Sequence, residues 1–231
     1  MEYLPNGFTL ELTPGAFPLS TDSMVLSHFV RLPKQAKVLD LGAGCGTLGL
    51  LLCAASQSGT VTGMELDENA HRGALENIAR NGLHNRMESI CADLRQLPPE
   101  FTGRFDCCVS NPPYFSGGPA AQRTPLARRE DCCSPAELFA AAAKALKFGG
   151  DFFLVHKPER LAELIARGSE VSLEAKRLLL LRHKALGPIT LICLQFRKGG
   201  KPGLAIEDAA LFDINNEPTA FYKSVYHITE D

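Results

Sequence analysis

The chain has 231 residues, of which 45% are hydrophobic and 22% are charged, and its formal net charge is −2. This length allows one sizeable hydrophobic core, and the near-neutral charge argues against a protein that binds nucleic acid through overall positive charge. No apolar run approaches the length of a membrane span, and the start of the chain lacks the pattern of a signal peptide. We therefore expect a cytoplasmic protein that does not associate with membranes.

The eight cysteines form no recognisable metal or disulfide pattern. Two pairs are adjacent in the sequence, Cys107–Cys108 and Cys132–Cys133, and the others lie in apolar segments. There is no C-x-x-C pair and no cluster of cysteine and histidine at zinc spacing. We therefore expect reduced, mostly buried thiols and no bound metal.

Segments with the patterns of strands and helices alternate along the chain. Short apolar runs predict strands, and apolar residues at helical spacing predict helices. The expected strands are residues 37–40, 60–65, 86–91, 105–110, 151–156, 174–181 and 189–196, and the expected helices are residues 47–55, 68–81, 134–147 and 158–167.

The helix expected at 134–147 has signals at both ends. Ser134, Pro135 and Glu137 have the pattern of a capping box with proline at the first helical position. The pair Gly149-Gly150 is the expected stop.

Alternation of strands and helices implies a parallel sheet with helices on both faces. Only residues 182–188 join the last two expected strands. That link is too short for a crossover, so these two strands should form an antiparallel hairpin. We therefore expect an α/β fold whose seven-stranded sheet is parallel except for one antiparallel strand.

A glycine-rich turn follows the first expected strand. In the sequence Asp40-Leu-Gly42-Ala-Gly44-Cys-Gly46, the glycines would let a ligand approach the main chain at the carboxyl edge of the sheet. Enzymes that bind a nicotinamide cofactor have similar turns, so the glycines alone do not distinguish a nicotinamide site from an S-adenosylmethionine site. The G-x-G-x-G spacing and Asp40 favour S-adenosylmethionine, because a carboxylate there can meet its cationic methionine end and would repel a pyrophosphate.

Polar residues also end the following strands. Glu65 can accept hydrogen bonds from both hydroxyls of a ribose. Asp93 can accept a hydrogen bond from an adenine amino group, while Leu94 packs on the ring. With Asn111 they place one polar residue at the end of each successive strand, along the edge where open α/β sheets bind ligands.

The sequence Asn111-Pro112-Pro113-Tyr114 follows the fourth expected strand, and its two prolines impose an extended elbow. The Asn111 side-chain oxygen and the Pro112 carbonyl can each accept one hydrogen of an aromatic amine, so that the nitrogen lone pair points at a methyl donor. Tyr114 would stack on the base. The motif therefore predicts methylation of a planar amine without a strong base.

These motifs resemble those of the class I, Rossmann-like amino-methyltransferases, which share an Asn/Asp-Pro-Pro-aromatic motif. The group includes adenine-N6 methyltransferases of DNA and RNA, guanine-N2 methyltransferases of ribosomal RNA and protein-glutamine methyltransferases. The resemblance implies a Rossmann-like fold and S-adenosyl-L-methionine as cofactor. The DNA enzymes usually add a target-recognition domain and the glutamine enzymes a helical N-terminal domain, and this chain has room for neither.

Other stretches narrow the resemblance to the small bacterial tRNA (adenine-N6)-methyltransferases, which modify the adenine 3′ of the anticodon in a valine tRNA. These stretches are residues 19–26, Tyr114-Phe115 with residues 127–130, and residues 217–226. The resemblance implies that Thr21 and Asp22 lie near the amino-acid end of the cofactor. At Arg129 the chain departs from relatives that often have histidine.

The sequence also suggests how the chain is divided. We expect residues 1–36 to form an N-terminal extension packed near the cofactor cleft, and residues 37–231 to form the methyltransferase domain. Residues 116–131 contain three arginines, and we expect them to form a basic loop that orders over RNA; the alternative is simple disorder without a role. The residues expected to contact the substrate are Pro113, Phe115, Arg123, Arg128 and Arg129.

Residues 176–201 contain seven Lys and Arg and no Asp or Glu. Such a stretch can follow the phosphates of a nucleic acid or form an ordinary solvated surface, and the sequence leaves both interpretations open.

We therefore expect an S-adenosylmethionine-dependent methyltransferase that acts on the amino group of an adenine in RNA, in a tRNA near the anticodon. Within the same chemistry, the guanine of ribosomal RNA and a protein glutamine remain alternative substrates. From other classes, an NAD-dependent oxidoreductase and a non-catalytic RNA-binding module remain alternatives. The sequence does not determine the oligomeric state, and a monomer is slightly favoured.

Overall fold

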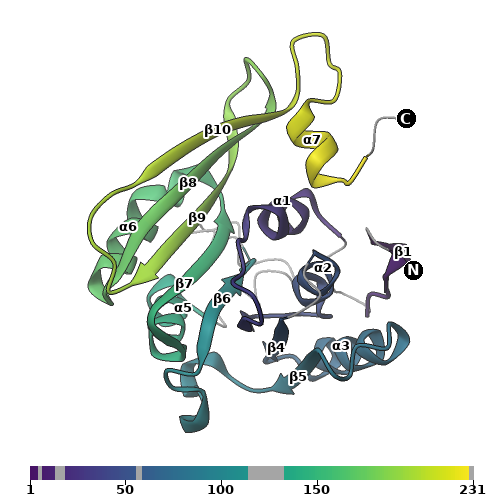
Figure 1. Cartoon of the computed structure of the whole chain (residues 1–231), viewed down its shortest axis with the longest axis vertical. Helices are drawn as coiled ribbons and strands as arrows, with labels where there is room; N and C mark the ends of the chain where they lie inside the picture. Colours follow the sequence, from purple (N-terminus) through teal and green to yellow (C-terminus); the bar gives the residue numbers. More distant parts are fainter. Residues whose placement is uncertain (5–6, 14–18, 56–58, 114–132, 229–231) are drawn as a thin grey trace, which may run out of the picture.

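The computed structural model describes residues 1–4, 7–13, 19–55, 59–113 and 133–228. Within these residues, eight strands form the main sheet in the order β10-β8-β9-β7-β6-β3-β4-β5 (Figure 1). In chain order they are β3 (Lys37–Leu41), β4 (Thr60–Glu65), β5 (Met87–Cys91), β6 (Phe105–Ser110), β7 (Leu146–His156), β8 (Leu173–Lys184), β9 (Ile189–Lys198) and β10 (Ala205–Phe212).

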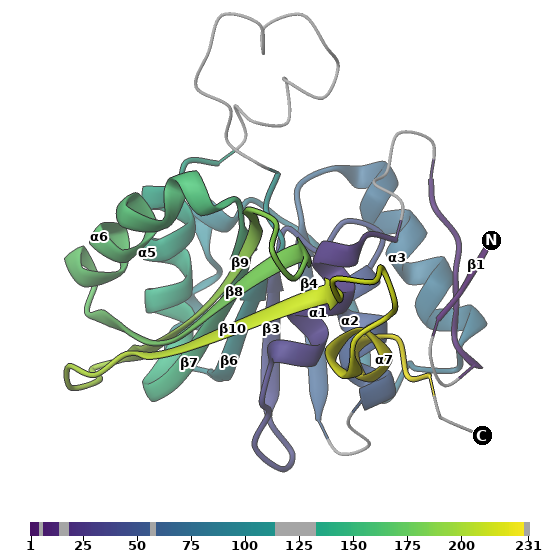
Figure 2. The same cartoon turned by 90° about the horizontal axis from the view of Figure 1, so that it is seen from above.

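Helices cover both faces of this sheet. α1, α2 and α3 lie on one side, and α5 and α6 lie on the other (Figures 1 and 2). The helices are α1 (Thr21–Phe29), α2 (Thr47–Ala55), α3 (Glu68–Arg80), α5 (Pro135–Ala145), α6 (Leu161–Glu170) and α7 (Ala220–Val225), with 3-10 turns η2 (Leu94–Gln96), η3 (Pro99–Phe101) and η5 (Pro158–Arg160). A separate two-stranded sheet pairs β1 (Glu2–Tyr3) with β2 (Thr9–Leu10).

The strands are apolar on both faces because two cores flank the sheet. In β3, Val38 belongs to the core under α1, α2 and α3, whereas Leu39 belongs to the core under α5 and α6. Neighbouring Cys107 and Cys108 of β6 divide in the same way and are buried free thiols. Continuous apolar runs at these positions follow from burial on both sides.

The expected mostly parallel sheet is confirmed. β9 is antiparallel to both of its neighbours, β7 and β8, while the other neighbouring pairs are parallel. The antiparallel hairpin is therefore β8–β9, as its short connection predicts.

The structure adds an eighth strand to the seven expected. β10 pairs in parallel with β8 at the edge of the sheet. Its sequence, Ala-Ile-Glu-Asp-Ala-Ala-Leu-Phe, has acidic residues at its centre and only one buried side chain, Leu211. An edge strand with so little burial has a weak apolar pattern, so the sequence did not reveal it.

The boundary between α5 and β7 also differs from the expectation. The capping box at Ser134 and Glu137 is present, but the helix ends at Ala145 and β7 starts at Leu146. Gly149 and Gly150 lie inside this strand, where the β6–β7 register shifts. Gly149 has a φ of 80°, and a Cβ on Gly150 would lie 2.9 Å from the Asp106 carbonyl oxygen. The glycine pair therefore forms an irregularity in the strand instead of a helix stop.

Candidate active site

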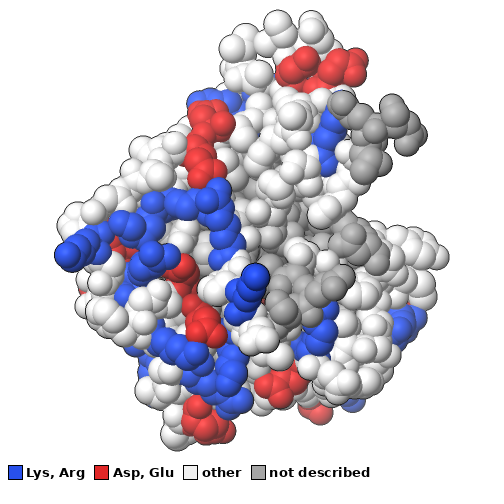
Figure 3. Space-filling view, in the orientation of Figure 1, with Lys and Arg blue, Asp and Glu red and all other residues white. Residues whose placement is uncertain are grey.

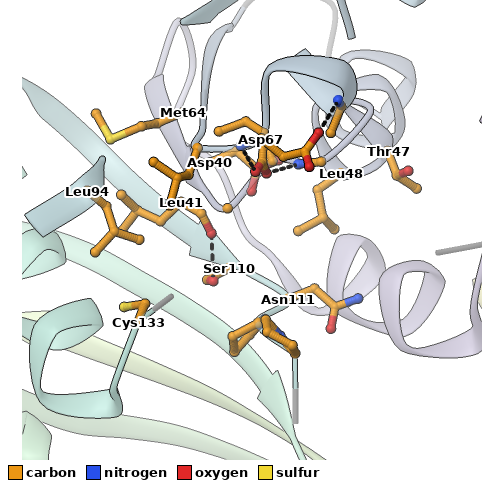
Figure 4. Close-up of a pocket in the computed structure, with 18 of the residues that line it drawn as sticks. Asp40, Leu41, Thr47, Leu48, Met64, Asp67, Leu94, Ser110, Asn111 and Cys133 are labelled. Carbon is orange, nitrogen blue, oxygen red and sulfur yellow. Dashed lines mark hydrogen bonds between the residues drawn. The ribbon is translucent and has the colours of Figure 1, made fainter. Parts of the chain in front are cut away.

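A cavity of about 640 Å³ lies at the carboxyl edge of the sheet. Figure 4 shows Asp40, Leu94, Asn111 and Cys133 around a common space. The lining comes from the ends of β3, β4 and β6, the turn after β5 and the starts of α1, α2 and α5. The expected site residues that line it are Asp22, Asp40, Gly42, Gly44, Glu65, Asp93, Leu94, Asn111, Pro112 and Pro113.

The glycine turn wraps one end of this cavity. Gly42 and Gly44 have φ values of 77° and 56°, which side chains with a Cβ rarely adopt. The Gly44 N–H donates to Glu65 Oε2 at 2.8 Å, and the Asp67 N–H donates to Glu65 Oε1 at 2.8 Å. Glu65 thus ties the turn after β3 to the turn after β4, and each of its oxygens retains a lone pair for a ligand.

Gly46 supports the turn from behind and is not among the residues that line the cavity in the described part of the chain. A Cβ there would lie 2.8 Å from Cε of Met87, and its φ is 86°. Its role is therefore in backbone conformation and packing.

Asp40 is the most unusual side chain of the cavity. It is 1% exposed, and neither carboxylate oxygen has a hydrogen-bond partner among the described residues. Burial, with the negative charge of Glu65 as the second cause, raises the pKa of Asp40 to about 8. A buried acceptor pair without a donor fits a cationic, hydrogen-bonding group of a ligand.

Asp22 lies in the first turn of α1 and also lines the cavity. Burial raises the pKa of Asp22, and the positive charge of Lys157 partly opposes that shift. Its neighbour Thr21 is not among the described lining residues, because its hydroxyl lies 3.1 Å from the hydroxyl of Tyr226. The structure therefore places Asp22, and not Thr21, at the cavity.

Asp93 and Leu94 follow β5 at the cavity wall. The Asp93 carboxylate caps η2 and accepts from the Arg95 guanidinium, with Nε 2.9 Å from each oxygen and Nη2 2.6 Å from Oδ2. The hydrogen bond from Arg95 holds the pKa of Asp93 below its ordinary value. Sequence reasoning missed this contact, although Arg95 is only two residues away.

Asn111 follows β6 and reaches the same cavity. The buried Ser110 hydroxyl donates to the Leu41 carbonyl oxygen at 2.8 Å, which joins the ends of β6 and β3 (Figure 4). Asn111 Nδ2 donates to Ser23 Oγ of α1 at 3.0 Å. Sequence reasoning did not single out Ser23, because it lies 88 positions before Asn111 along the chain.

The remaining expected substrate contacts fall outside the described residues. They are Tyr114, Phe115, Arg123, Arg128 and Arg129, with the expected basic loop 116–131.

The basic stretch 176–201 makes contacts within the protein. Arg177 pairs with Glu207, Arg182 with Asp208, and Arg197 with Asp151. Lys176 and Lys198 donate to backbone carbonyl oxygens. Figure 3 shows acidic side chains between the basic ones on this side of the molecule. Most of the local positive charge is therefore matched by neighbouring acceptors.

Two further properties bear on the kind of protein. In the part of the chain that the structure describes, no helix is long and apolar enough to cross a membrane. The same residues contain no group of three or more His, Cys, Asp or Glu side chains placed to hold a metal ion.

The order of the strands and the position of the cavity are those of a Rossmann-like methyltransferase fold, and solved structures superpose on this chain. A predicted O-methyltransferase from Agrobacterium tumefaciens superposes with a TM-score of 0.75, at 19% identity over 90% of this chain and 96% of that one. TYW2 from P. horikoshii, solved with MeSAdo, superposes with a TM-score of 0.60 at 18% identity over 85% and 70% of the two chains.

A model of the methyltransferase small domain matches residues 20–167, and the chain belongs to this family. The cofactor of this family is S-adenosyl-L-methionine, in agreement with the prediction from the sequence.

Relatives named tRNA1(Val) (adenine(37)-N6)-methyltransferase are similar to part of the chain. The protein of Shewanella sp. (strain W3-18-1) is 38% identical over 136 residues, which is 57% of each chain. That of Bacteroides fragilis is 34% identical over 152 residues, which is 64% of this chain and 63% of the relative. The chain thus spans about three-fifths of the length of the curated relatives it matches.

Proposed function

We propose that the protein methylates the exocyclic amino group of an adenine in RNA, in a tRNA near the anticodon, with S-adenosylmethionine as methyl donor. The observation that carries this proposal is that Asn111 shares a cavity with the buried Asp40, whose carboxylate oxygens have no hydrogen-bond partner among the described residues. Asn111 can accept a hydrogen bond from an amine, and Asp40 can bind the cationic end of the cofactor. The names of the relatives support tRNA as the acceptor, and a tRNA substrate would place the protein in the cytoplasm.

The cofactor side of the cavity has a matching set of acceptors. Asp40 and Asp22 would accept from the ammonium group, and Glu65 from the ribose hydroxyls. Leu94 would pack on the adenine ring, and Asp93, which Arg95 holds, would accept from the adenine amino group. When bound, the cofactor supplies an electrophilic methyl group on a sulfonium.

The amine side is built from the Asn-Pro-Pro elbow. Asn111 Nδ2 is engaged by Ser23, so Asn111 Oδ1 is the atom left to accept a hydrogen of the substrate amine. The Pro112 carbonyl would accept the other hydrogen, so that the nitrogen lone pair is held toward the methyl group. These acceptors stabilise the positive charge that develops on nitrogen, and this requires no strong base.

Other contacts in this proposal lie partly outside the described residues. Pro113 and Phe115 would border the flipped base, and Tyr114 would stack on it. Arg123, Arg128 and Arg129 would contact the RNA backbone. An adenine in an anticodon loop is already partly unpaired, so exposing it costs less than in a duplex.

The test is transfer of a labelled methyl group from the cofactor to purified tRNA, followed by nucleoside mass spectrometry. We expect N6-methyladenosine, and we expect Asn111→Ala to lower the rate by about 100-fold or more, because it removes an acceptor from the developing charge. Asn215→Ala, an exposed asparagine after β10, serves as the matched control and should keep the wild-type rate.

The same experiment distinguishes the alternatives. Methylguanosine from ribosomal RNA, or label in protein glutamine, would reassign the substrate within the same chemistry. Full activity of a folded Asn111→Ala variant would contradict the proposed role of the elbow.

A further inference from the structure

The Asn111 side chain can serve as an acceptor in the cavity in only one of its two orientations. Its carboxamide has an oxygen at one end and an NH₂ group at the other, and the two ends have similar shapes. With Oδ1 toward the cavity, the amide accepts a hydrogen of the substrate amine. With the NH₂ group there, two donors would face each other.

We propose that Ser23 of α1 is a positioning residue that holds the Asn111 carboxamide with Oδ1 toward the cavity. This proposal rests on the proposed function. The Ser23 hydroxyl accepts from Asn111 Nδ2 at 3.0 Å, so the donor end of the amide is directed at α1. Ser23 is 6% exposed, so water has little access to replace this contact.

Ser20 is placed to accept the hydrogen of the Ser23 hydroxyl. Its hydroxyl oxygen caps α1 by accepting from the Ser23 N–H at 3.3 Å, and it lies 3.4 Å from the Ser23 hydroxyl. If the Ser23 hydroxyl donates to Ser20, its own lone pairs face Asn111. Ser23 then requires a donor from Asn111, and the NH₂ end supplies it.

A contact with the C-terminal part of the chain helps to fix the position of α1. The Thr21 hydroxyl lies 3.1 Å from the hydroxyl of Tyr226, the residue that follows α7. Met24, Val25 and Leu26 are buried in the core. The first turn of α1 therefore presents Ser23 to the β6 elbow as a fixed partner and not as a mobile side chain.

Removal of the Ser23 hydroxyl should affect turnover more than cofactor binding. Without it, both amide orientations become accessible and Nδ2 loses its partner. We expect Ser23→Ala to lower kcat by about five- to tenfold, the range that one hydrogen bond of this kind contributes. The Kd for S-adenosylhomocysteine should remain within about twofold of wild type.

Asn111→Asp provides the decisive comparison. A carboxylate has two equivalent oxygens, so an acceptor faces the cavity in either orientation and nothing needs to be selected. We therefore expect Ser23→Ala to reduce kcat by less than about twofold when combined with Asn111→Asp. Equal losses in the two backgrounds would overturn the positioning role.

Two further variants separate positioning from stability. Ser27 is on the same helix, and its hydroxyl donates to the Met24 carbonyl oxygen at 2.8 Å. Because Ser27 does not line the cavity, Ser27→Ala should keep the wild-type kcat. Ser23→Thr retains the hydroxyl and should recover most of the activity. If the Asn111→Asp enzyme is too slow to assay, the Ser23→Thr variant is the deciding test. A loss of kcat in Ser23→Thr as large as that in Ser23→Ala would overturn the proposal.

The wild-type rate on tRNA is measured first. Wild-type protein that binds S-adenosylhomocysteine but methylates no amine overturns the proposed function and the role of Ser23 together. Active wild-type protein with an unchanged kcat in folded Ser23→Ala overturns the role of Ser23 alone.

Discussion

Three carboxylates of the cavity differ in pKa for different physical reasons. Burial raises the pKa of Asp40 to about 8 and raises that of Asp22, whereas hydrogen bonds from Arg95 lower that of Asp93. Asp93 is therefore charged before a ligand arrives, but Asp40 holds a proton over most of the neutral range. At neutral pH, a cationic ligand that reaches Asp40 should shift it to the ionised form.

We expect ligand binding to release a proton from Asp40. A cation beside this carboxyl lowers its raised pKa, so binding at pH 7 should release a proton, and affinity should rise as pH is raised toward 8. Calorimetry with S-adenosylhomocysteine in two buffers of different ionisation enthalpy measures the release. Asp40→Asn should remove most of it and weaken binding. Equal proton release in wild type and variant would contradict the assignment.

Among the helices and strands, α3 covers the sheet and, with the residue that follows it, also binds the N-terminal segment at residues 9–11. The buried Asn77 accepts from the Glu11 N–H at 2.9 Å and donates to the Glu11 carbonyl oxygen at 2.9 Å and to that of Cys45 at 3.0 Å. One turn later, Asn81 makes the same pair of bonds with Thr9 at 2.8 Å. Two asparagines four residues apart thus hold the segment at 9–11 as a neighbouring strand would.

Asn77→Ala should detach this segment and destabilise the fold. It leaves the backbone groups of Glu11 and the Cys45 carbonyl without their partner, which we expect to cost about 2–3 kcal/mol of unfolding free energy. Urea unfolding measures the loss, and hydrogen exchange should show faster exchange at residues 9–11.

The control for this experiment is on the same helix. Asn69→Ala changes an exposed asparagine and should cost less than about 0.5 kcal/mol. A similar loss in both variants would mean that helix propensity, and not the anchoring of the N-terminal segment, causes the effect.

For the molecule as a whole, Arg177 joins three parts of the fold. Its guanidinium lies 4.2 Å from the centroid of the Phe29 ring of α1, and its Nε donates to Glu207 of β10 at 2.9 Å. Its side chain is only 13% exposed. This residue of the basic stretch therefore holds β8, β10 and α1 together and has little surface left for RNA.

Arg177→Ala should lower stability by about 2 kcal/mol, since it removes a charged hydrogen bond and a cation–π contact. We expect no change in the slope of log K for tRNA against log salt concentration, because a residue that touches no phosphate releases no counterion. Lys184→Ala, an exposed change in the same stretch, is the control for stability. A smaller slope in folded Arg177→Ala would show that this residue contacts RNA.

Features that depend on neighbouring residues could be predicted from the sequence. The alternation of strands and helices, the capping box at Ser134, the turn at Gly42 and Gly44 and the stiff elbow at Pro112 all follow from local backbone chemistry and from burial on two faces. The parallel order then predicts that Asp40 and Asn111 meet at one edge, because parallel strands end on the same side of a sheet.

Features that depend on contacts between segments distant in the sequence could be seen only in the folded chain. The weakly apolar β10, the extension of β7 back to Leu146 and the pairing of Arg177 with Glu207 each need a partner that is distant in the sequence. The same is true of Ser23, which reaches Asn111 because the first turn of α1 lies beside the residue that follows β6. Local chemistry determines the reactive groups, and the packing of distant segments determines which of their atoms face the cavity.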